Sequence, residues 1–582
     1  MISPEEAFLI FKSFIEEKGL VRQHLDSYNE FIEHDIQEVI DEIGEIDIEV
    51  TDKPYKVRFG KVFIARETEN GVICGPYITE VDGTRHEIYP MEARLRNLTY
   101  AMPISVEMFT IVDGREVDKE IIYICDMPTM LKSKYCHLYG LSDEDLIRHG
   151  EDPLDPGGYF IINGSERVIV ALEDLAPNRI LTDFETKGST LVYKAKIFST
   201  TVGFRARIEM RMKSNGALSV SMPGVPSEIP FIVLMRALGL KSDKEIAEAV
   251  SLDREVQNEL EPSFEEAAEV VTVEDALLYI GNRVAHGQVK SYRLQRAETI
   301  LDRIFMPHVG RSPNKRIEKA YLLGEMAARV IELRLSKRKP DDKDHMKNKR
   351  LKLSGPLLAD LFRVAFRNLC RDIKYQLERI GSKKRAMSIS VAVRPGIITE
   401  KLQHALATGN WGRGKVGITQ LLDRTNIVST YSHLRRVQSP LSRGQPNFEA
   451  RDLHATHWGR FCPNETPEGA NCGLVKNFAL SASLSIGVDP EKVRRELYRR
   501  GVIPLLEADE TLKRNGAKVF VNGAPIGYCS DPESLVEGLR RARRRGEISP
   551  EINVAYFDEK YGVSRREVYV NCDEGRIRRP LI

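Results

Sequence analysis

Two adjacent arginines, Arg435 and Arg436, follow His433 in the part of the sequence best suited to bind phosphate. Guanidinium groups bind backbone phosphates through paired, charge-assisted hydrogen bonds, so two arginines on one loop could hold a nucleic-acid strand. The alternative is an internal role, in which the same arginines form salt bridges to Asp423 or Glu465. The residue types alone leave both interpretations open.

A glycine-rich stretch, Asn410-Trp-Gly-Arg-Gly-Lys-Val-Gly417, is a second candidate for contact with nucleic acid. Its glycines allow the backbone to move freely. Arg413 and Lys415 supply positive charge that attracts phosphate, and Trp411 is expected to anchor the base of the loop.

The run Asp341-Asp-Lys-Asp-His345 is the nearest approach to a cluster of metal ligands. We interpret it as a solvated turn with ion pairs to the flanking lysines and arginines at 337–339 and 347–350. The eight cysteines include no CxxC pair, so the sequence indicates neither a zinc knuckle nor a redox dithiol. No local signature supports a catalytic triad. We therefore predict no catalytic residue and no metal site in this chain.

The most informative stretch of the sequence is an unusual loop, Cys462-Pro-Asn-Glu-Thr-Pro-Glu-Gly-Ala-Asn-Cys-Gly-Leu-Val-Lys-Asn477. Helix and strand interiors do not tolerate Pro463 and Pro467, so the stretch is predicted to be a shaped loop that leads into a buried strand.

Length and composition describe a folded chain of several domains. A length of 582 residues implies roughly three to five domains. The chain is 42% hydrophobic and 29% charged, and its net charge of +1 means that contact with nucleic acid must come from local patches. Basic clusters occur at Lys383–Arg385 and at Arg540–Arg545, the second of which we interpret as a solvated face or a subunit contact.

The sequence also predicts where the chain is located. No apolar run reaches the roughly 18 residues that a membrane helix needs. The N-terminus has the pattern of a capped helix, with Ser3, Pro4 and Glu6 at its start and an end near Gly19, so it is not a signal peptide. We expect a cytoplasmic protein that makes no membrane contact.

The elements alternate between strand and helix patterns. Tyr55–Ile64 has the strand period, and Asn163-Gly164 joins two β-rich runs into a predicted hairpin. Phe204–Lys213 is predicted to bury one face of a strand and expose a mostly basic one. Helices are predicted at 273–284, 317–334, 355–380 and 533–545. The fold class is mixed α/β (α+β), with several domains.

Three phrases in this order closely resemble the fork region of the second-largest subunit of multisubunit DNA-directed RNA polymerases: Asp423–Arg436, Arg451–Arg460 and Cys462–Asn477. The resemblance extends over essentially the whole chain. The motif sequences are closer to those of archaeal and eukaryotic subunits than to those of bacterial ones. It implies a protrusion at 1–178 and 337–395, a lobe at 179–336, a fork at 396–480 and a first external domain at 481–582. We call residues 396–480 the fork segment.

The resemblance also implies which residues face nucleic acid. Asp423–Arg436 aligns without a gap with the region that faces the RNA–DNA hybrid in bacterial homologues and forms their rifamycin pocket. The glycine-rich loop matches a loop near the downstream edge of the transcription bubble. The implied nucleic-acid-facing residues are Arg413, Lys415, Gln420, Asp423, Arg424, His433, Arg435, Arg436, Glu468 and Asn471.

A member of this family would take part in DNA-templated RNA synthesis from ribonucleoside triphosphates without supplying the main metal ligands. The resemblance implies that Mg²⁺ is held by the largest subunit (A′/A″). Implied partners are the second half of a split B subunit (B′), the other polymerase subunits, the DNA template and the nascent RNA. Two alternatives stay open: a stand-alone nucleic-acid-binding or scaffold protein that reuses the fork, and a truncated piece of an intact subunit.

Overall fold

The computed structural model describes residues 3–49, 54–64, 75–80, 82–188, 190–201, 203–382, 388–412, 414–558 and 565–579. The chain divides into two compact units. Unit 1 comprises residues 1–174, 351–486 and 575–582, and unit 2 comprises residues 175–350 and 487–574. The four domains expected from the family resemblance are a finer division, which stays a prediction.

Unit 1 contains the following elements: α1 (Pro4–Lys18), α2 (Arg22–Glu30), the π-helical η1 (Phe31–Asp35), α3 (Ile36–Ile43), β1 (Glu45–Ile48), β2 (Tyr55–Ile64), β3 (Tyr77–Thr79), β4 (Arg85–Glu87), α4 (Pro90–Leu95), β5 (Ala101–Val112), β6 (Arg115–Pro128), α5 (Asp143–Arg148), β7 (Phe160–Ile162), β8 (Ser165–Ile169), β9 (Ala171–Leu175), α13 (Ser354–Ser382), α14 (Ile389–Ala392), α15 (Gly396–Thr408), β16 (Thr419–Leu421), α16 (Ile427–Leu434), β17 (Arg436–Gln438), α17 (Phe448–Arg451), the 3₁₀ turns η4 (Ala455–His457) and η5 (Gly469–Asn471), β18 (Val475–Asn477), β19 (Ser483–Leu484) and β25 (Ile577–Arg578).

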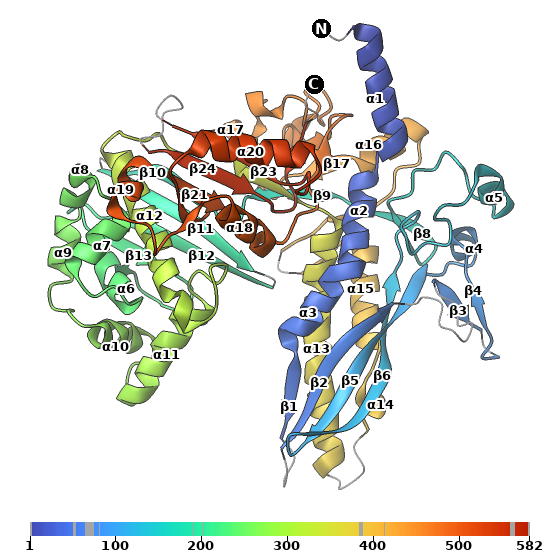
Figure 1. Ribbon diagram of the computed structural model, residues 1–582. Coiled ribbons are helices and arrows are strands. Elements are labelled where there is room, and N and C mark those ends of the chain that lie inside the picture. Colours follow the sequence, from blue (N-terminus) through green and yellow to red (C-terminus); the bar gives the residue numbers. More distant parts are fainter. Residues whose placement is uncertain are drawn as a thin grey trace. The chain divides into compact units, whose positions relative to one another are not determined.

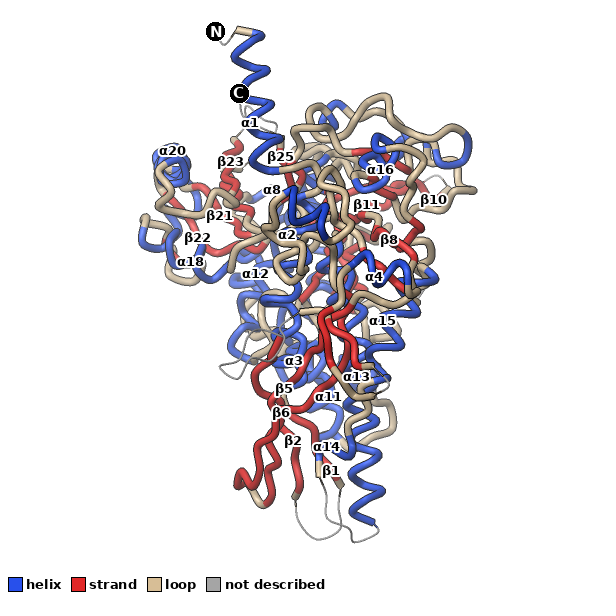
Figure 2. Tube along the Cα trace, turned by 90° about the vertical axis from the view of Figure 1, so that its right-hand side faces the viewer, coloured by secondary structure: helices blue, strands red, loops and turns tan. Residues whose placement is uncertain are grey.

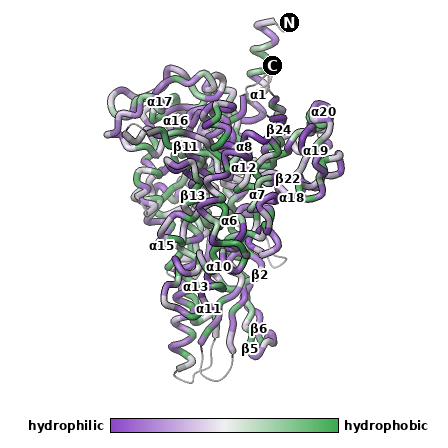
Figure 3. The backbone as a smooth tube through the Cα atoms, turned by 90° about the vertical axis from the view of Figure 1, so that its left-hand side faces the viewer, coloured by the Kyte–Doolittle hydropathy of each residue, from purple (hydrophilic) through white to green (hydrophobic). Residues whose placement is uncertain are grey.

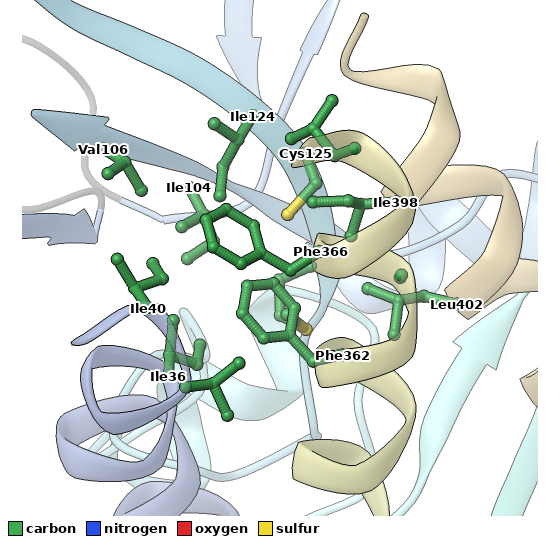
Figure 4. Close-up of a cluster of buried hydrophobic side chains, with 14 of the residues drawn as sticks. Ile36, Ile40, Ile104, Val106, Ile124, Cys125, Phe362, Phe366, Ile398 and Leu402 are labelled. Atoms are coloured by element: carbon green, nitrogen blue, oxygen red, sulfur yellow. The ribbon is translucent and has the colours of Figure 1, made fainter. Parts of the chain in front are cut away.

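The main sheet of unit 1 has the order β1-β2-β5-β6, and all of its pairings are antiparallel. Helix α13 lies along one face of this sheet (Figures 1 and 2). Its Phe362 and Phe366 point into a core that also contains Ile104 and Ile124 of the strands and Ile40 of α3 (Figure 4). The sheet is therefore buried on its helix side.

In helix α13 the spacing of apolar residues in the sequence determines which face of the helix is buried. Its buried apolar residues recur mostly every three or four positions, as one face of a helix requires: Leu357, Leu358, Ala359, Leu361, Phe362, Ala365, Phe366, Leu369, Cys370, Ile373 and Leu377. Gly355 permits a close approach at the start of the helix, because a Cβ there would lie 2.3 Å from the carbonyl oxygen of Ser27. Loss of that glycine would separate α13 from α2.

Unit 2 contains β10 (Ile180–Lys187), β11 (Thr190–Thr201), β12 (Phe204–Met212), β13 (Leu218–Ser221), β14 (Ile229–Pro230), α6 (Phe231–Ala237), α7 (Asp243–Val250), α8 (Arg254–Asn258), α9 (Glu261–Glu266), α10 (Val273–Val284), α11 (Lys290–Arg303), the 3₁₀ turn η2 (Pro313–Lys315), α12 (Arg316–Arg334), the 3₁₀ turn η3 (Met346–Asn348), β15 (Lys349–Lys352, which reaches into unit 1), α18 (Pro490–Arg499), β20 (Ile503–Pro504), α19 (Glu510–Asn515), β21 (Ala517–Val521), β22 (Ala524–Cys529), α20 (Pro532–Arg544), β23 (Asn553–Phe557) and β24 (Glu567–Asn571).

Unit 2 has two hydrophobic cores. One packs the antiparallel sheet β10-β11-β12-β13-β14 against helices of the 231–335 region, including α12. The other packs the sheet β20-β22-β21-β24-β23 against α18 and α20. Helix α20 buries Leu535, Val536 and Leu539 on one face, so its arginines lie on the remaining surface of an amphipathic helix.

A cluster of buried charges joins these two parts of unit 2. The carboxylate of Glu325, fully buried on α12, lies 2.7 Å from the Nζ of Lys518 and 2.8 Å from the Nε of Arg329. Arg565 approaches the same carboxylate to 3.1 Å. Burial opposes ionisation of Glu325, but the surrounding cations outweigh it and hold the pKa of Glu325 well below its ordinary value.

Several local predictions are confirmed. Strand β2 spans the predicted residues, and β7 and β8 form the hairpin with Asn163 and Gly164 at φ of 49° and 75°. Helix α1 begins at Pro4, and Ser3 and Glu6 form its capping box. The basic run at 383–385 lies outside the described residues.

Among the described residues, no helix is long and apolar enough to cross a membrane. Figure 3 shows hydrophobic and hydrophilic residues interleaved along the helices.

We predict that Glu325→Gln destabilises unit 2 by about 3–5 kcal/mol, because it leaves several buried cations without their carboxylate. The wild-type contribution should be present above the ordinary glutamate pKa of about 4.3 and should be lost as the pH falls below it, since the folded-state pKa is depressed. Urea unfolding between pH 3 and 7, read by a brief hydrogen-exchange pulse over β21, measures both effects. Glu318→Gln, at a partly exposed pair on the same helix, is the control, and equal midpoints for the two variants would contradict the prediction.

Candidate nucleic-acid interface

The fork segment is built on strands from the first part of unit 1. Strand β16 pairs antiparallel with β8, and β17 lies between β9, which runs parallel to it, and β18, which runs antiparallel. Helix α16 leads directly into β17 and begins at Asn426, whose side chain caps it together with Ser429. The predicted site residues between 420 and 436 are therefore held by segments about 250 residues earlier in the chain.

Three predicted residues, Gln420, Asp423 and His433, are brought together. The backbone N–H of Asp423 donates to the Nδ1 of His433 at 3.1 Å, so Nε2 carries the proton and donates to the Oε1 of Gln420 at 3.0 Å. Burial, with a smaller effect from the charge of Arg436, lowers the pKa of His433 to about 4. We refer to these three residues as the His433 row, and its histidine is neutral at pH 7.

Arg424 is bound to internal partners. Its guanidinium donates to Glu166 at 2.6 Å, to Asp155 at 2.7 Å and to the hydroxyl of Tyr159 at 2.8 Å. Arg94 donates to the same Glu166 from the other side. Burial opposes the ionisation of Glu166, but the two arginines outweigh it and lower its pKa.

Arg435 is buried, with 6% of its surface exposed. Its guanidinium donates to the carbonyl oxygen of Leu20, to that of Ala479 at 2.7 Å and to that of Leu480 at 3.5 Å. Burial lowers the pKa of Arg435 to about 10. The hydrogen bonds that the structure shows for Arg435 are thus internal and go to carbonyl groups. Of the two carboxylates expected from sequence, Glu465 acts on Arg435 through its charge, which opposes the lowering of the pKa.

Arg436 differs from its neighbour. It lies on β17 opposite Asn477 and is half-buried. Within the described residues its guanidinium has no hydrogen bond and no ion pair. It lies close enough to the His433 row for its positive charge to contribute to the lowered pKa values of both His433 and Asp423.

The glycine-rich loop carries Lys415, whose Nζ lies 3.7 Å from Asp360 and whose side chain is 43% exposed. Trp411 packs against the core of unit 1, and its indole N–H donates to Thr419 at 3.0 Å, so it anchors the base of the loop as predicted. Arg413 lies outside the described residues.

Glu468 and Asn471 lie on the proline-containing loop, at the 3₁₀ turn η5. Glu468 is exposed, and Asn471 is half-buried with its Oδ1 lacking a hydrogen-bond partner within the described chain. The loop continues into β18, which confirms the predicted loop and strand. No contact in the described residues joins either side chain to the His433 row.

Two residues that hold this loop in place, Arg451 and Lys476, were not among the site residues predicted from the sequence. Arg451 donates to the carbonyl oxygens of Ala470 and Cys472 at 2.8 and 2.9 Å. Lys476 forms a buried ion pair with Glu173 at 2.8 Å. Both lie within the phrases that carry the family resemblance, but a partner distant in sequence leaves no local pattern that identifies its role.

Among the described residues there is no group of three or more side chains suited to hold a metal ion. Asp341 accepts hydrogen bonds from the backbone and hydroxyl of Thr182 and lies 3.6 Å from Arg338, with 12% of its side chain exposed. The predicted ion pairs are present, including Lys349 with Asp344 at 2.9 Å. The prediction of a solvated turn is wrong for Asp341, because Thr182 of a neighbouring strand covers its carboxylate.

Three family models match successive parts of the chain. One, described as RNA polymerase beta subunit, matches residues 19–400. Two others, described as RNA polymerase Rpb2 domain 3 and domain 4, match residues 420–484 and 519–582. The chain belongs to the RNA polymerase beta subunit family.

Within that family, the chain is similar to archaeal RNA polymerase subunits. DNA-directed RNA polymerase subunit Rpo2 of Saccharolobus shibatae is 49% identical over 590 residues, which cover 100% of this chain and 51% of that protein. Subunit Rpo2N of Methanococcus vannielii is 49% identical over 84% of this chain and 97% of its own length. Subunit Rpo2N of Halobacterium salinarum is 46% identical over 86% and 97%. The chain spans about half the length of the Rpo2 relatives that it matches and nearly all of those named Rpo2N.

The two adjacent arginines should behave differently when each is replaced by alanine. Arg435→Ala is expected to destabilise unit 1 by about 2–4 kcal/mol, because it leaves buried carbonyl groups without a donor. Arg436→Ala should change stability by less than about 0.5 kcal/mol, because it removes no hydrogen bond or ion pair to any residue that the structure describes. Urea unfolding read by hydrogen exchange over β17 measures this. Equal effects of the two substitutions would show that the assignment is wrong.

The His433 row should make stability depend on pH. The folded-state pKa of about 4 lies below the ordinary value of about 6.5, so the unfolded chain binds an extra proton between these values. The contribution of His433 to the free energy of unfolding should be fully present above pH 6.5 and should decrease as the pH falls toward 4. In His433→Gln the proton uptake on unfolding near pH 5 should decrease by about one proton. Parallel pH profiles for wild type and variant, from urea midpoints at pH 4–8, would contradict this.

Proposed function

We propose that this chain forms one wall of the active cleft of a multisubunit DNA-directed RNA polymerase, as the first half of a second-largest subunit. The complex would make RNA on a DNA template from the four ribonucleoside triphosphates. The chain would contact the RNA–DNA hybrid and the downstream fork through the fork segment. Family membership and the likeness to Rpo2 and Rpo2N support this proposal.

One observation carries the residue assignment. Of the six fork-segment arginines that the structure describes, four donate side-chain hydrogen bonds within the chain: 424, 435, 451 and 460. The guanidinium groups of Arg436 and Arg443 have no hydrogen bond or ion pair within the described residues, and of these two Arg443 is exposed, whereas Arg436 is half-buried beside the His433 row. A half-buried guanidinium without a partner is available for the charge-assisted bonds that a backbone phosphate offers. We assign the phosphate contact to Arg436 and a positioning role to Arg424 and Arg435.

The His433 row would fix where that guanidinium lies. His433 and Gln420 tie α16 to β16, and Gln420 also donates to the carbonyl oxygen of Gly417 at 3.1 Å. The carboxylate of Asp423 is held by the backbone and hydroxyl of Thr425. Side chains locked in this way hold a charged group within a fraction of an ångström, which is what catalysis by positioning requires.

Lys415 would supply a second, weaker contact. Its ion pair with Asp360 is long and exposed, and pairs of this kind contribute little stability, so a phosphate could replace the carboxylate. Arg413, Glu468 and Asn471 complete the proposed hybrid-facing set. Their placement rests on the family resemblance.

The catalytic metal would come from elsewhere in the complex. The aspartates nearest to a ligand cluster in this chain are engaged with Thr182, Arg338 and Lys349, so these residues do not fit a catalytic Mg²⁺ site. We assign Mg²⁺ to the largest subunit and derive no catalytic step from residues of this chain. Its contribution would be positioning and electrostatics.

The proposed partners are the second half of a split B subunit, the largest subunit, the remaining polymerase subunits, the DNA template and the nascent RNA. The protrusion, lobe, fork and first external domain, with the boundaries given by the resemblance, are part of the same proposal, as is a cytoplasmic location. Names such as Rpo2N support membership of a polymerase complex.

Reconstitution tests the function. The chain alone should make no RNA, and mixing it with the second-half polypeptide and the other subunits should restore template-dependent synthesis. Template-dependent synthesis by this chain alone would overturn the proposal, and so would a complete reconstituted complex that is inactive.

In such a complex Arg436→Ala should slow elongation and weaken binding of an RNA–DNA hybrid, and the slope of log affinity against log salt should decrease by about one. Arg495→Ala, at an exposed arginine of α18, is the control and should leave both unchanged. Elongation rates and filter-binding titrations at several salt concentrations provide the measurement. Unchanged elongation would remove Arg436 from the proposed site.

A further inference from the structure

Helix α1 differs from its neighbours because none of its residues is buried by the rest of the chain. Phe8, Leu9 and Ile10 are 64%, 63% and 58% exposed. Figures 1 and 2 show α1 projecting from unit 1. Such a concentration of exposed large apolar side chains on one helix indicates a surface that another molecule covers.

The sequence of α1 has the pattern of a helix that packs on one side. Its apolar residues recur at helical spacing along one stripe: Ala7, Ile10, Phe11, Phe14 and Ile15. A capping box fixes where the helix begins. An isolated helix of this length is only marginally stable in water, so packing of the stripe must supply the remaining stability.

The charges of α1 select the kind of partner. Glu5, Glu6, Glu16 and Glu17 outnumber Lys12 and Lys18. Helices that lie on anionic membranes are basic on their polar face, and nucleic acid is bound by cations, so neither ligand suits this helix. An apolar stripe flanked by carboxylates fits a protein groove that is apolar in the centre and basic at its rim.

The position of α1 in the fold indicates which partner protein would bind it. Arg435 binds the carbonyl oxygen of Leu20, at the base of α1, and that of Ala479. The N–H of Ala479 donates to the carbonyl oxygen of Arg460, whose guanidinium donates to that of Ile577 in β25. These hydrogen bonds connect the base of α1 to β25 through the fork segment. In a relative whose chain continues beyond β25, the continuation starts from a strand that these hydrogen bonds connect to the base of α1.

The Rpo2 relatives contain a polypeptide segment that could occupy this surface. Rpo2 of Saccharolobus shibatae matches the whole of this chain with only 51% of its own length, so about half of it has no counterpart here. We propose that α1 is a docking helix for the polypeptide that corresponds to this unmatched half, the second-half polypeptide named above. The inference rests on the proposed function, because that function supplies the partner.

A photo-crosslinking side chain at Phe8, in the complex assembled from all polymerase subunits, identifies the occupant. The expected product joins this chain to the second-half polypeptide. A product with another subunit, a product with a second copy of this chain, or the absence of any product would overturn the inference. If the same complex still makes RNA, the proposed function survives that result. If the wild-type complex makes none, the proposed function fails first.

A matched pair of variants measures the contribution of the exposed apolar side chains of α1. Phe8→Glu combined with Ile10→Glu adds two negative charges on exposed apolar positions, and Lys12→Glu changes the net charge by the same amount on the polar face. The double variant should weaken association with the second-half polypeptide about tenfold or more, and Lys12→Glu by less than about twofold. Helicity measured by circular dichroism confirms folding of both. Equal affinities for the two variants would overturn the inference.

Discussion

The guanidinium of Arg435 is the constraint on which the fork segment depends. It is a buried positive charge, and its two terminal nitrogens donate to carbonyl groups from two distant segments, one at Leu20 and one at Ala479 and Leu480. A buried cation that lost these acceptors would be strongly destabilising, so the start of α2, the end of α16 and the end of β18 must be in place together. This requirement ties the first residues of the chain to the fork. It also sets the base from which α1 projects.

The other fork cations follow from the same principle. Arg424 is enclosed by carboxylates of the hairpin region and Arg451 by carbonyl groups of the proline-containing loop. These bonds make the scaffold rigid and remove both side chains from any role that needs a free guanidinium. The guanidinium of Arg436 has no such bond among the described residues and lies near a histidine whose burial keeps it neutral. The proposed site would therefore separate residues that hold the geometry from the one proposed to contact the phosphate.

Unit 2 uses charge differently. Glu325 on α12 forms ion pairs with Lys518, Arg329 and Arg565. This cluster connects the two cores of the unit. A buried carboxylate surrounded by cations is weak evidence for added stability, but removing any one member leaves an unpaired charge. The cluster therefore specifies how α12 and the β21 sheet pack together. In unit 1 the corresponding role falls mainly to the apolar face of α13.

The sequence by itself determined the features whose causes are local. The capping box at Ser3 and Glu6, the hairpin turn at Asn163 and Gly164, the period of α13 and the loop around Pro463 each depend on residues within one or two turns of the chain, and each is confirmed. The order of the fork phrases also predicted the family. Only the tertiary structure decided which arginine is available, because Arg435 and Arg436 are adjacent and chemically identical. Their difference comes from Leu20, more than 400 residues away in sequence, whose carbonyl reaches one guanidinium and not the other.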